Sequence, residues 1–204
     1  MYLCTHEDRP RGEDLTTLYL VRHGEVYNPR GIIYGRLPGF GLSERGQEQL
    51  GAVAEKLRAD GPPTVLYASP MQRAQESAAI LNAALGLEIH TDERLIETSI
   101  GSFQGKRFED LPKPYISEEG AHPEIEAASS MRNRLLDWVA DAHARHPHAT
   151  IAAVSHRDPI IVALLHWMGQ DLSALPEFAL EPGGIYAVEF EENSDESTTV
   201  RALG

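Results

Sequence analysis

The residues best suited to chemistry are two histidines and two arginines that follow apolar runs. Arg22 and His23 end the run LTTLYLVRH, and His156 ends the run TIAAVSH. A third run, TVLYASP, is followed by Arg73. Guanidinium groups match phosphate oxygens in pairs, and an unprotonated imidazole is a nucleophile. These residue types at these places predict a phosphate site.

The apolar runs are expected to be strands that alternate with helices. Such alternation implies right-handed crossovers and a mainly parallel sheet with helices on both faces, an α/β/α fold of three layers. In an open sheet of this kind, ligands bind outside the carboxyl ends of the strands, where the residues above would meet. The runs expected as central strands are LTTLYLVRH, TVLYASP, TIAAVSH and GGIYAVEFEE, with LEIHTDERL near an edge.

Capping residues mark the predicted helices. Ser43 is expected to be the N-cap of a helix that ends at Gly61, and Gly86 is expected to end the next helix. Ser69 and Pro70 are of the types that occupy the cap and the first turn of a helix, so the second helix is predicted to begin there. The free N-H groups at the helix starts would favour an anion.

The chain is predicted to hold one domain over residues 15–204, after a tail at 1–14 without chemistry. The segment at about 104–128 interrupts the alternation with proline, glycine and charge, so we expect it to form a small lid. No internal repeat is evident.

Composition limits the classes of partner. The 204 residues carry a formal net charge of -13, which argues against nucleic acid or an anionic membrane as a partner. The single cysteine, Cys4, allows no intrachain disulfide, and no segment has about 18 continuous apolar residues. The expected location is the cytoplasm. The composition leaves open whether the chain is a monomer or a homodimer.

Each candidate also has a purely structural interpretation. A histidine that ends a buried strand can simply be hydrogen-bonded to the backbone, and Arg73 could be a solvated helix charge. The two histidines at corresponding strand ends, His23 and His156, are harder to explain in this way than either alone. Gly24 would allow the backbone close to an oxyanion, but a turn after a strand also favours glycine.

Several motifs together resemble a known family. LVRHGE, LSERG, ASPMQRAQESA, LIETSIGSFQG and AVSHRDPI occur in the order found in the histidine phosphatase superfamily, the phosphoglycerate mutase-like proteins. The resemblance extends from about Leu18 to about Val188 and implies the phosphoglycerate mutase-like fold.

The resemblance also implies roles for five residues. His23 would be the nucleophile that becomes phosphorylated, and Arg22, Arg73 and His156 would hold the phosphoryl oxygens. Glu97, which by itself could be any loop carboxylate, stands where the family has its acid and would protonate the leaving oxygen. A protonated His156 and two guanidiniums would stabilise the phosphoryl charge, so no metal or cofactor is required.

The chain departs from the family pattern in two places. RHGEVYN is one residue shorter than the usual loop, which puts Asn28 out of register as a phosphate or substrate contact. The alignment recovers at Gly35, where the family has a pocket glycine. Arg157 stands after His156, where small residues are usual, and either contacts the substrate or points to solvent.

The lid region separates phosphatase from mutase. Mutase members carry a tyrosine just after the acid and a pair of arginines for the substrate carboxylate, whereas here ETSIGSF is followed only by Lys106 and Arg107. Water is therefore the expected acceptor, and a phosphatase acting on a small phosphorylated molecule is the favoured prediction. A phosphoglycerate mutase, or a phosphate- or phosphoprotein-binding module without activity, remains an alternative. The substrate is not predicted.

Overall fold

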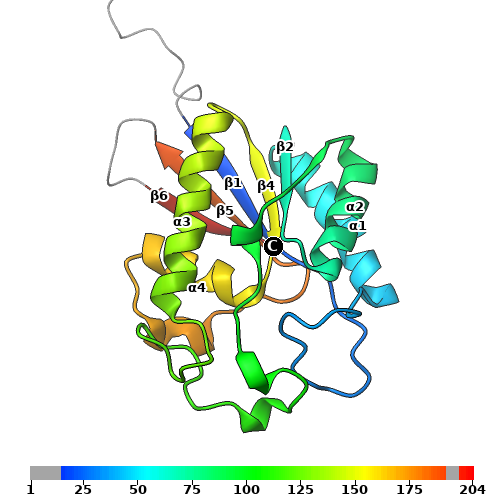
Figure 1. The fold of residues 1–204 in the computed structure, drawn as a ribbon. Helices are drawn as coiled ribbons and strands as arrows, with labels where there is room; N and C mark the ends of the chain where they lie inside the picture. Colours follow the sequence, from blue (N-terminus) through cyan, green and yellow to red (C-terminus); the bar gives the residue numbers. More distant parts are fainter. Residues whose placement is uncertain (1–14, 192–197) are drawn as a thin grey trace, which may run out of the picture.

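A computed structural model describes residues 15–191 and 198–204; the predicted tail lies outside the described residues. Six strands form one sheet in the order β3-β2-β4-β1-β5-β6 (Figure 1). Their bounds are β1 Leu15–Arg22, β2 Val65–Ala68, β3 Ile89–Thr91, β4 Ile151–Ser155, β5 Ile185–Glu191 and β6 Thr198–Leu203.

The sheet is mostly parallel, as predicted. Strands β1 to β4 pair parallel, while β5 pairs antiparallel with β1 and β6 antiparallel with β5. β3 lies at one edge, where the weaker LEIHTDERL run was expected. β6 forms the other edge and was not predicted, because a half-buried edge strand carries little continuous apolar sequence.

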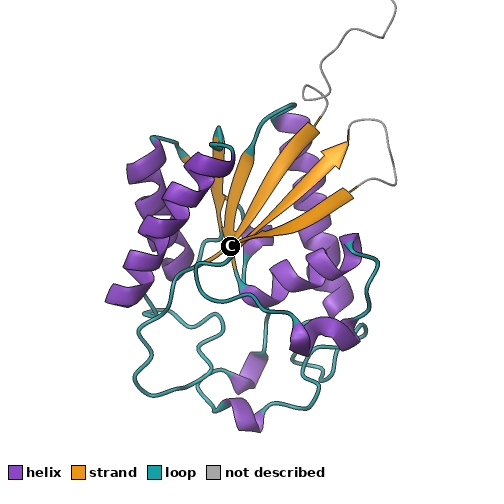
Figure 2. Ribbon diagram, turned by 180° about the vertical axis from the view of Figure 1, so that it is seen from behind, coloured by secondary structure: helices purple, strands orange, loops and turns teal. Residues whose placement is uncertain are grey.

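Helices cover both faces of the sheet, which confirms the three-layer α/β/α architecture (Figures 1 and 2). One pair packs together on one face and a second pair on the other. The first pair is α1 Glu44–Asp60 and α2 Gln72–Leu85; the second is α3 Ala128–Arg145 and α4 Arg157–Trp167. None of the described helices is long and apolar enough to cross a membrane.

Capping explains where the helices of the first pair begin and end. The Ser43 hydroxyl accepts a hydrogen bond from the Gly46 N-H at 3.0 Å, as an N-cap does. Gly61 ends α1, and Gly86 ends α2 in the left-handed conformation, at φ 71°. These three boundaries agree with the predictions.

The start of α2 differs from the prediction. The helix begins at Gln72 with Met71 as its N-cap, not at Ser69 and Pro70. The Ser69 hydroxyl accepts from the Met71 N-H at 3.3 Å and also lies 2.7 Å from His156 Nε2. Ser69 therefore holds a histidine in place instead of capping a helix.

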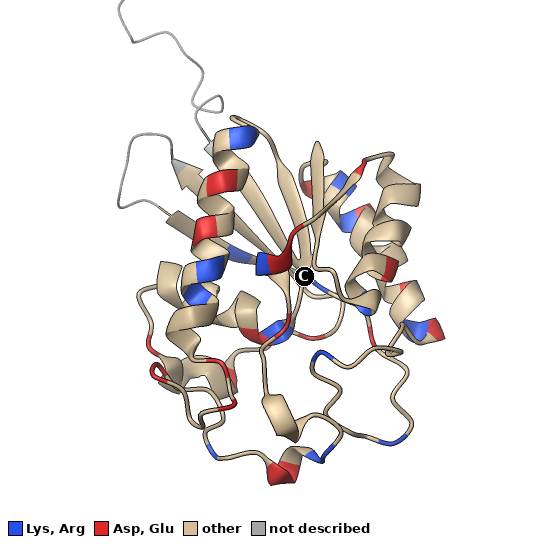
Figure 3. Ribbon diagram, viewed as in Figure 1, with Lys and Arg blue, Asp and Glu red and all other residues tan. Residues whose placement is uncertain are grey.

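The core is divided by the sheet into two apolar clusters. One lies under α3 and α4 and includes the fully buried Trp138; the other lies under α1 and α2. All five residues of β4 are buried, so this strand is covered on both faces. Figure 3 shows that β2 and β4 carry no charged residues, whereas the helices carry many.

Three neighbouring strands end at the same level of the sheet. His23, after β1, donates its N-H to Ser155 O at 3.0 Å, and Ser69, after β2, donates to Val154 O at 2.9 Å. His156 follows β4, which lies between the other two. Because these strands are parallel, their carboxyl ends meet, and His23, Ser69 and His156 lie together at the carboxyl end of the sheet.

Loops and short 3-10 helices lie beyond the carboxyl ends of the parallel strands, below the strands in Figure 1. The region expected as a lid, 104–128, contains no described strand and packs through Leu111 and Ile125 against Ile33 and Ile100. Within the described residues, the 3-10 helices are η1 Glu93–Leu95, η2 Gly101–Phe103, η3 Phe108–Asp110 and η4 Leu172–Glu177.

Candidate active site

His23 is held as a neutral imidazole whose lone pair is on Nε2. Its Nδ1-H donates to the carbonyl oxygen of Gly24 at 2.8 Å, and its Nε2 accepts from Arg73 Nε at 3.2 Å. Complete burial and the Arg73 charge lower the pKa of His23 well below its ordinary value. The proton is thus on Nδ1 and the lone pair is on Nε2, the arrangement that nucleophilic attack requires.

His156 lies beside His23, with the ring centroids 5.1 Å apart. Burial, followed by the charge of Arg73, lowers the pKa of His156 well below its ordinary value. A neutral His156 is therefore favoured in the ligand-free protein, since a second buried cation beside Arg73 is unfavourable. The protonated His156 predicted for the phosphate-bound protein stays a prediction. A bound dianion would reverse this balance.

Arg73 is completely buried, which excludes the solvated helix charge that was the alternative. Its Nη2 donates to Gly35 O at 2.9 Å and lies 3.8 Å from Glu97 Oε2. The guanidinium also lies over the Tyr34 ring, 4.7 Å from the centroid. Arg73 is thus fixed in orientation from several sides.

Three buried nitrogens of the predicted phosphate ligands have no hydrogen-bond partner. They are Arg22 Nε, Arg73 Nη1 and His156 Nδ1. The other nitrogens of Arg22 are partly used, because Nη1 donates to Leu180 O at 2.6 Å. Buried polar atoms are nearly always paired, so three unpaired nitrogens in one site indicate a place for an anion with several acceptor oxygens.

Glu97 supplies a carboxyl group that can carry a proton near neutral pH. Its Oε1 accepts from the Thr98 N-H at 2.8 Å, and its Oε2 lies 3.7 Å from His156 Nδ1. Burial and the nearby charge of Asp158 raise its pKa to about 7, against the opposing effect of Arg73. A carboxyl group with such a pKa can act as both acid and base.

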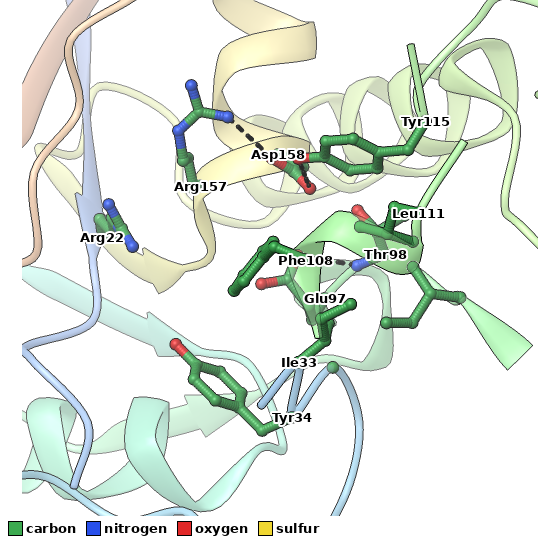
Figure 4. Close-up of a pocket in the computed structure, with 12 residues that line it drawn as sticks. Arg22, Ile33, Tyr34, Glu97, Thr98, Phe108, Leu111, Tyr115, Arg157 and Asp158 are labelled. Atoms are coloured by element: carbon green, nitrogen blue, oxygen red, sulfur yellow. Dashed lines mark hydrogen bonds and ion pairs between the residues drawn. The ribbon is translucent and has the colours of Figure 1, made fainter. Parts of the chain in front are cut away.

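A cavity of about 110 Å³ opens beside these groups (Figure 4). Arg22 and Glu97 line it, whereas His23, Arg73 and His156 are almost fully buried and are not among its lining residues. Glu97 Oε2 lies 3.7 Å from His156 Nδ1, so the part of the cavity next to these groups is called the phosphate end below. Apolar and aromatic side chains line most of the rest. The complete lining is Arg22, Ile33, Tyr34, Gly35, Glu97, Thr98, Ile100, Phe108, Leu111, Tyr115, Arg157 and Asp158.

Gly24 has a packing reason to be glycine, and the expected approach of its backbone to an oxyanion stays a prediction. A Cβ atom at this position would lie 2.5 Å from Gly46 O and 2.6 Å from Leu50 Cδ2. The Gly24 N-H donates to Ser77 Oγ at 3.2 Å. The glycine therefore allows the loop to pack against α1, and its N-H is directed to a side chain of α2.

The remaining predicted contacts have different outcomes. Gly35 lines the cavity with φ 45° and accepts from Arg73, so both its conformation and its carbonyl serve the site. Asn28 is not among the lining residues; its Nδ2 donates to Ile32 O at 2.8 Å. Arg157 lines the cavity, and its Nη1 donates to Asp158 Oδ1 at 3.1 Å.

Sequence reasoning missed Asp158 as part of the site. Its carboxylate accepts from the Tyr115 hydroxyl, with distances of 3.1 and 3.0 Å to Oδ1 and Oδ2, and burial raises its pKa. Figure 4 shows Asp158 between Arg157 and Tyr115 at the cavity wall. The available signal was an acidic residue directly after Arg157 in the first turn of an apolar helix.

The same cluster also offers metal-ligating atoms. One atom from each of His23, Glu97 and His156 lies within 4.8 Å of the others. However, the Nε2 lone pair of His23 already accepts from Arg73, and the guanidinium would repel a cation. The donor set therefore fits an anion better than a metal ion.

Comparisons with known proteins find relatives over most of the chain. The chain is 38% identical over 170 residues to the uncharacterized protein Rv0525 of Mycobacterium tuberculosis, covering 77% of this chain and 81% of that protein. It is 30% identical to phosphoserine phosphatase 1 of Hydrogenobacter thermophilus, covering 87% and 88%. A solved mycobacterial glucosyl-3-phosphoglycerate phosphatase, Rv2419c, is 25% identical with a TM-score of 0.78, covering 92% and 97%.

The model of the histidine phosphatase superfamily (branch 1) matches residues 18–202, nearly the whole described structure. Phosphoserine phosphatase 1 and the glucosyl-3-phosphoglycerate phosphatase are named for different phosphorylated molecules. The chain belongs to the histidine phosphatase superfamily and is a phosphoric monoester hydrolase.

Proposed function

We propose that the protein hydrolyses a small phosphomonoester through a phosphohistidine on His23, without a metal ion. The observation that carries this proposal is the state of His23: Nδ1-H donates to Gly24 O, and the lone pair is on Nε2. A buried histidine with only a structural role would not need a lone pair directed at an arginine in an anion site.

Substrate binding would satisfy the unpaired nitrogens. Phosphate oxygens accept from Arg22 Nε, Arg73 Nη1 and His156 Nδ1, which are the buried atoms without partners. His156 gains a proton as the dianion arrives, because the added negative charge raises its pKa. The phosphate is then fixed next to Nε2 of His23.

Attack on phosphorus forms a bond to His23 Nε2 and breaks the bond to the leaving oxygen. The imidazole becomes positively charged, and the Gly24 carbonyl stabilises that charge through the Nδ1-H. Arg22 and Arg73 stabilise the charge on the phosphoryl oxygens, as metal ions do in other phosphotransfer enzymes.

Glu97 serves both halves of the reaction. In its acid form it donates a proton to the leaving oxygen, and the resulting carboxylate then removes a proton from the attacking water. Hydrolysis breaks the bond between phosphorus and His23 and returns the proton to Glu97. The pKa of about 7 suits both steps, because neither form is strongly disfavoured near neutral pH.

Water is the proposed acceptor rather than a phosphoglycerate. A mutase needs free cations for the carboxylate of its substrate, but the described cavity wall offers only Arg22 and Arg157 as cations. Arg22 faces the phosphate end, and Arg157 is paired with Asp158. An assay for exchange between 2- and 3-phosphoglycerate tests this choice directly.

The proposal is tested by trapping the intermediate. The protein is mixed with a labelled aryl phosphate near pH 6 in the presence of a chelator and quenched in alkali, where phosphohistidine survives. The expected result is turnover that persists with chelator, a labelled protein, and loss of both in His23→Ala. His166→Ala, which changes an exposed histidine on α4, is the matched control. Turnover by His23→Ala at the parent rate would overturn the proposal.

The proposal also includes a location in the cytoplasm. It is supported by Cys4 as the only cysteine, since a chain with one cysteine cannot form an intrachain disulfide. Fractionation of cells that produce the protein checks this point.

A further inference from the structure

The cavity becomes apolar away from its phosphate end. Ile33, Ile100 and Leu111 line it and belong to a small core of their own. Phe108 also lines it, although this side chain is 63% exposed. A leaving group that carries polar hydroxyl or amino groups would find few partners on these walls.

A second cavity of about 230 Å³ adjoins the first. It lies between the lid region and η4, and the two cavities share the side chains of Tyr115 and Arg157. Its walls are almost entirely apolar. They consist of Pro114, Tyr115, Ile116, Arg157, Leu172, Leu175 and Pro176.

The two shared side chains have their polar ends already paired. The Tyr115 hydroxyl donates to Asp158, and Arg157 Nη1 donates to Asp158 Oδ1 at 3.1 Å. Arg157 Nη2 also lies 3.4 Å from Leu175 O. Asp158 thus neutralises the only charged residue in the described wall of the second cavity. What remains for a ligand is apolar surface.

We infer that the substrate is a phosphomonoester whose leaving group ends in an apolar chain or ring, and that the second cavity binds this end. The inference rests on the proposed function, because the phosphate must be held at Arg22 and Arg73 for the leaving group to reach Tyr115. The two cavities share Tyr115 and Arg157 as wall residues, so the second one lies next to the substrate cavity and we assign it to the substrate rather than to a separate partner.

Alkylphosphonates test this inference without depending on turnover, because their carbon-phosphorus bond is not hydrolysed. We expect the dissociation constant, measured by calorimetry, to fall about fourfold for each added methylene from methyl- to hexylphosphonate, until the cavity is filled. A matched polar ligand, 3-hydroxypropylphosphonate, should bind more weakly than butylphosphonate, since its hydroxyl loses water without finding a partner.

Leu172→Asn makes the second cavity polar. It should reduce the gain in affinity from methyl- to hexylphosphonate, the ratio of their dissociation constants, at least tenfold. Leu85→Asn is the matched control, because Leu85 is also partly buried but packs on the opposite core cluster and lines neither cavity. If Leu172→Asn fails to fold, Pro176→Asn changes an exposed residue of the same wall.

The outcomes separate this inference from the proposed function. Methylphosphonate that binds as tightly as hexylphosphonate would overturn the apolar leaving group and leave the phosphate site intact. Failure of methylphosphonate and of inorganic phosphate to bind would overturn both. If affinity rises equally with alkyl length in Leu172→Asn and in the parent, the alkyl chain of the ligand does not enter the second cavity, and the inference is overturned.

Discussion

The two ends of the cavity are built in opposite ways. At the phosphate end, His23 and His156 directly follow parallel strands, and Arg73 lies one residue inside α2. All three are almost fully buried. At the other end, Phe108 and Tyr115 come from loops and a 3-10 helix, and Phe108 is largely exposed.

This difference means that the reacting groups and the residues that contact the leaving group come from different parts of the fold. Groups at the ends of paired strands are fixed by the backbone ladder, as transfer of a phosphoryl group requires. Loops tolerate substitution more readily, so one phosphate end can serve many leaving groups. The related phosphatases named above act on different phosphorylated molecules, in agreement with this division.

The largest effect is expected at the phosphate end, from Arg73→Leu. The change removes the charge and the donors to His23 and Gly35, so kcat/KM should fall on the order of 10³- to 10⁵-fold. Arg58→Leu, at a more exposed position on α1, is the control. Thermal unfolding of both variants separates loss of function from loss of fold. If kcat/KM falls less than tenfold in folded Arg73→Leu, the phosphate end is not the part of the cavity on which the chemistry depends.

Glu97→Gln tests the junction between the two ends. Without an acid, hydrolysis of an alkyl phosphate should slow by about 10²- to 10⁴-fold. An aryl phosphate, whose leaving group departs without a proton, should still phosphorylate His23. The phosphoenzyme then accumulates, because the second step lacks its base, and a burst of phenol release measures this. Parent activity on alkyl phosphates would exclude Glu97 as the acid.

A smaller effect is expected from Asp158→Asn. The negative charge of Asp158 raises the pKa of Glu97, so its removal should lower that pKa from about 7. Glu97 donates a proton only below its pKa, so activity should begin to fall at a lower pH, shifted by roughly one unit. The pH profile of kcat/KM on one alkyl phosphate shows the shift, because the titration of the substrate is common to both proteins.

Asp137→Asn, at an exposed position on α3, is the control for that profile. An unchanged high-pH limb in Asp158→Asn would mean that Asp158 does not raise the pKa of Glu97.

The main residues of the phosphate end could be predicted from the sequence because their positions follow from neighbouring residues in the chain. Each histidine directly follows an apolar run, and parallel strands necessarily bring their ends to one edge. The contact between His23 Nδ1 and the Gly24 carbonyl is local in the same sense, since the two residues are adjacent in the chain. The caps of α1 depend on nearest neighbours in the same way.

The other end could not be predicted because its contacts join distant residues. Tyr115 and Asp158 are 43 positions apart, and nothing in either segment indicates the other. Two features of the phosphate end also depend on tertiary structure and could not be predicted: the packing of Gly24 against α1 and the contact of Ser69 with His156. The neutral state of His156 also follows from burial, which the sequence does not give by itself.

The smallest effect is expected from Asn28→Ala, in the loop that is one residue shorter than the family pattern. Asn28 Nδ2 donates to Ile32 O, and its Oδ1 accepts from the Ile32 N-H at 3.3 Å, so both ends of the amide are used within the loop. Loss of these bonds should lower stability by about 1 kcal/mol, while kcat/KM should change less than threefold. Chemical denaturation and steady-state kinetics measure the two effects on one preparation. A tenfold loss of kcat/KM at unchanged stability would mean that Asn28 contacts the substrate, and the boundary of the phosphate end would then include this loop.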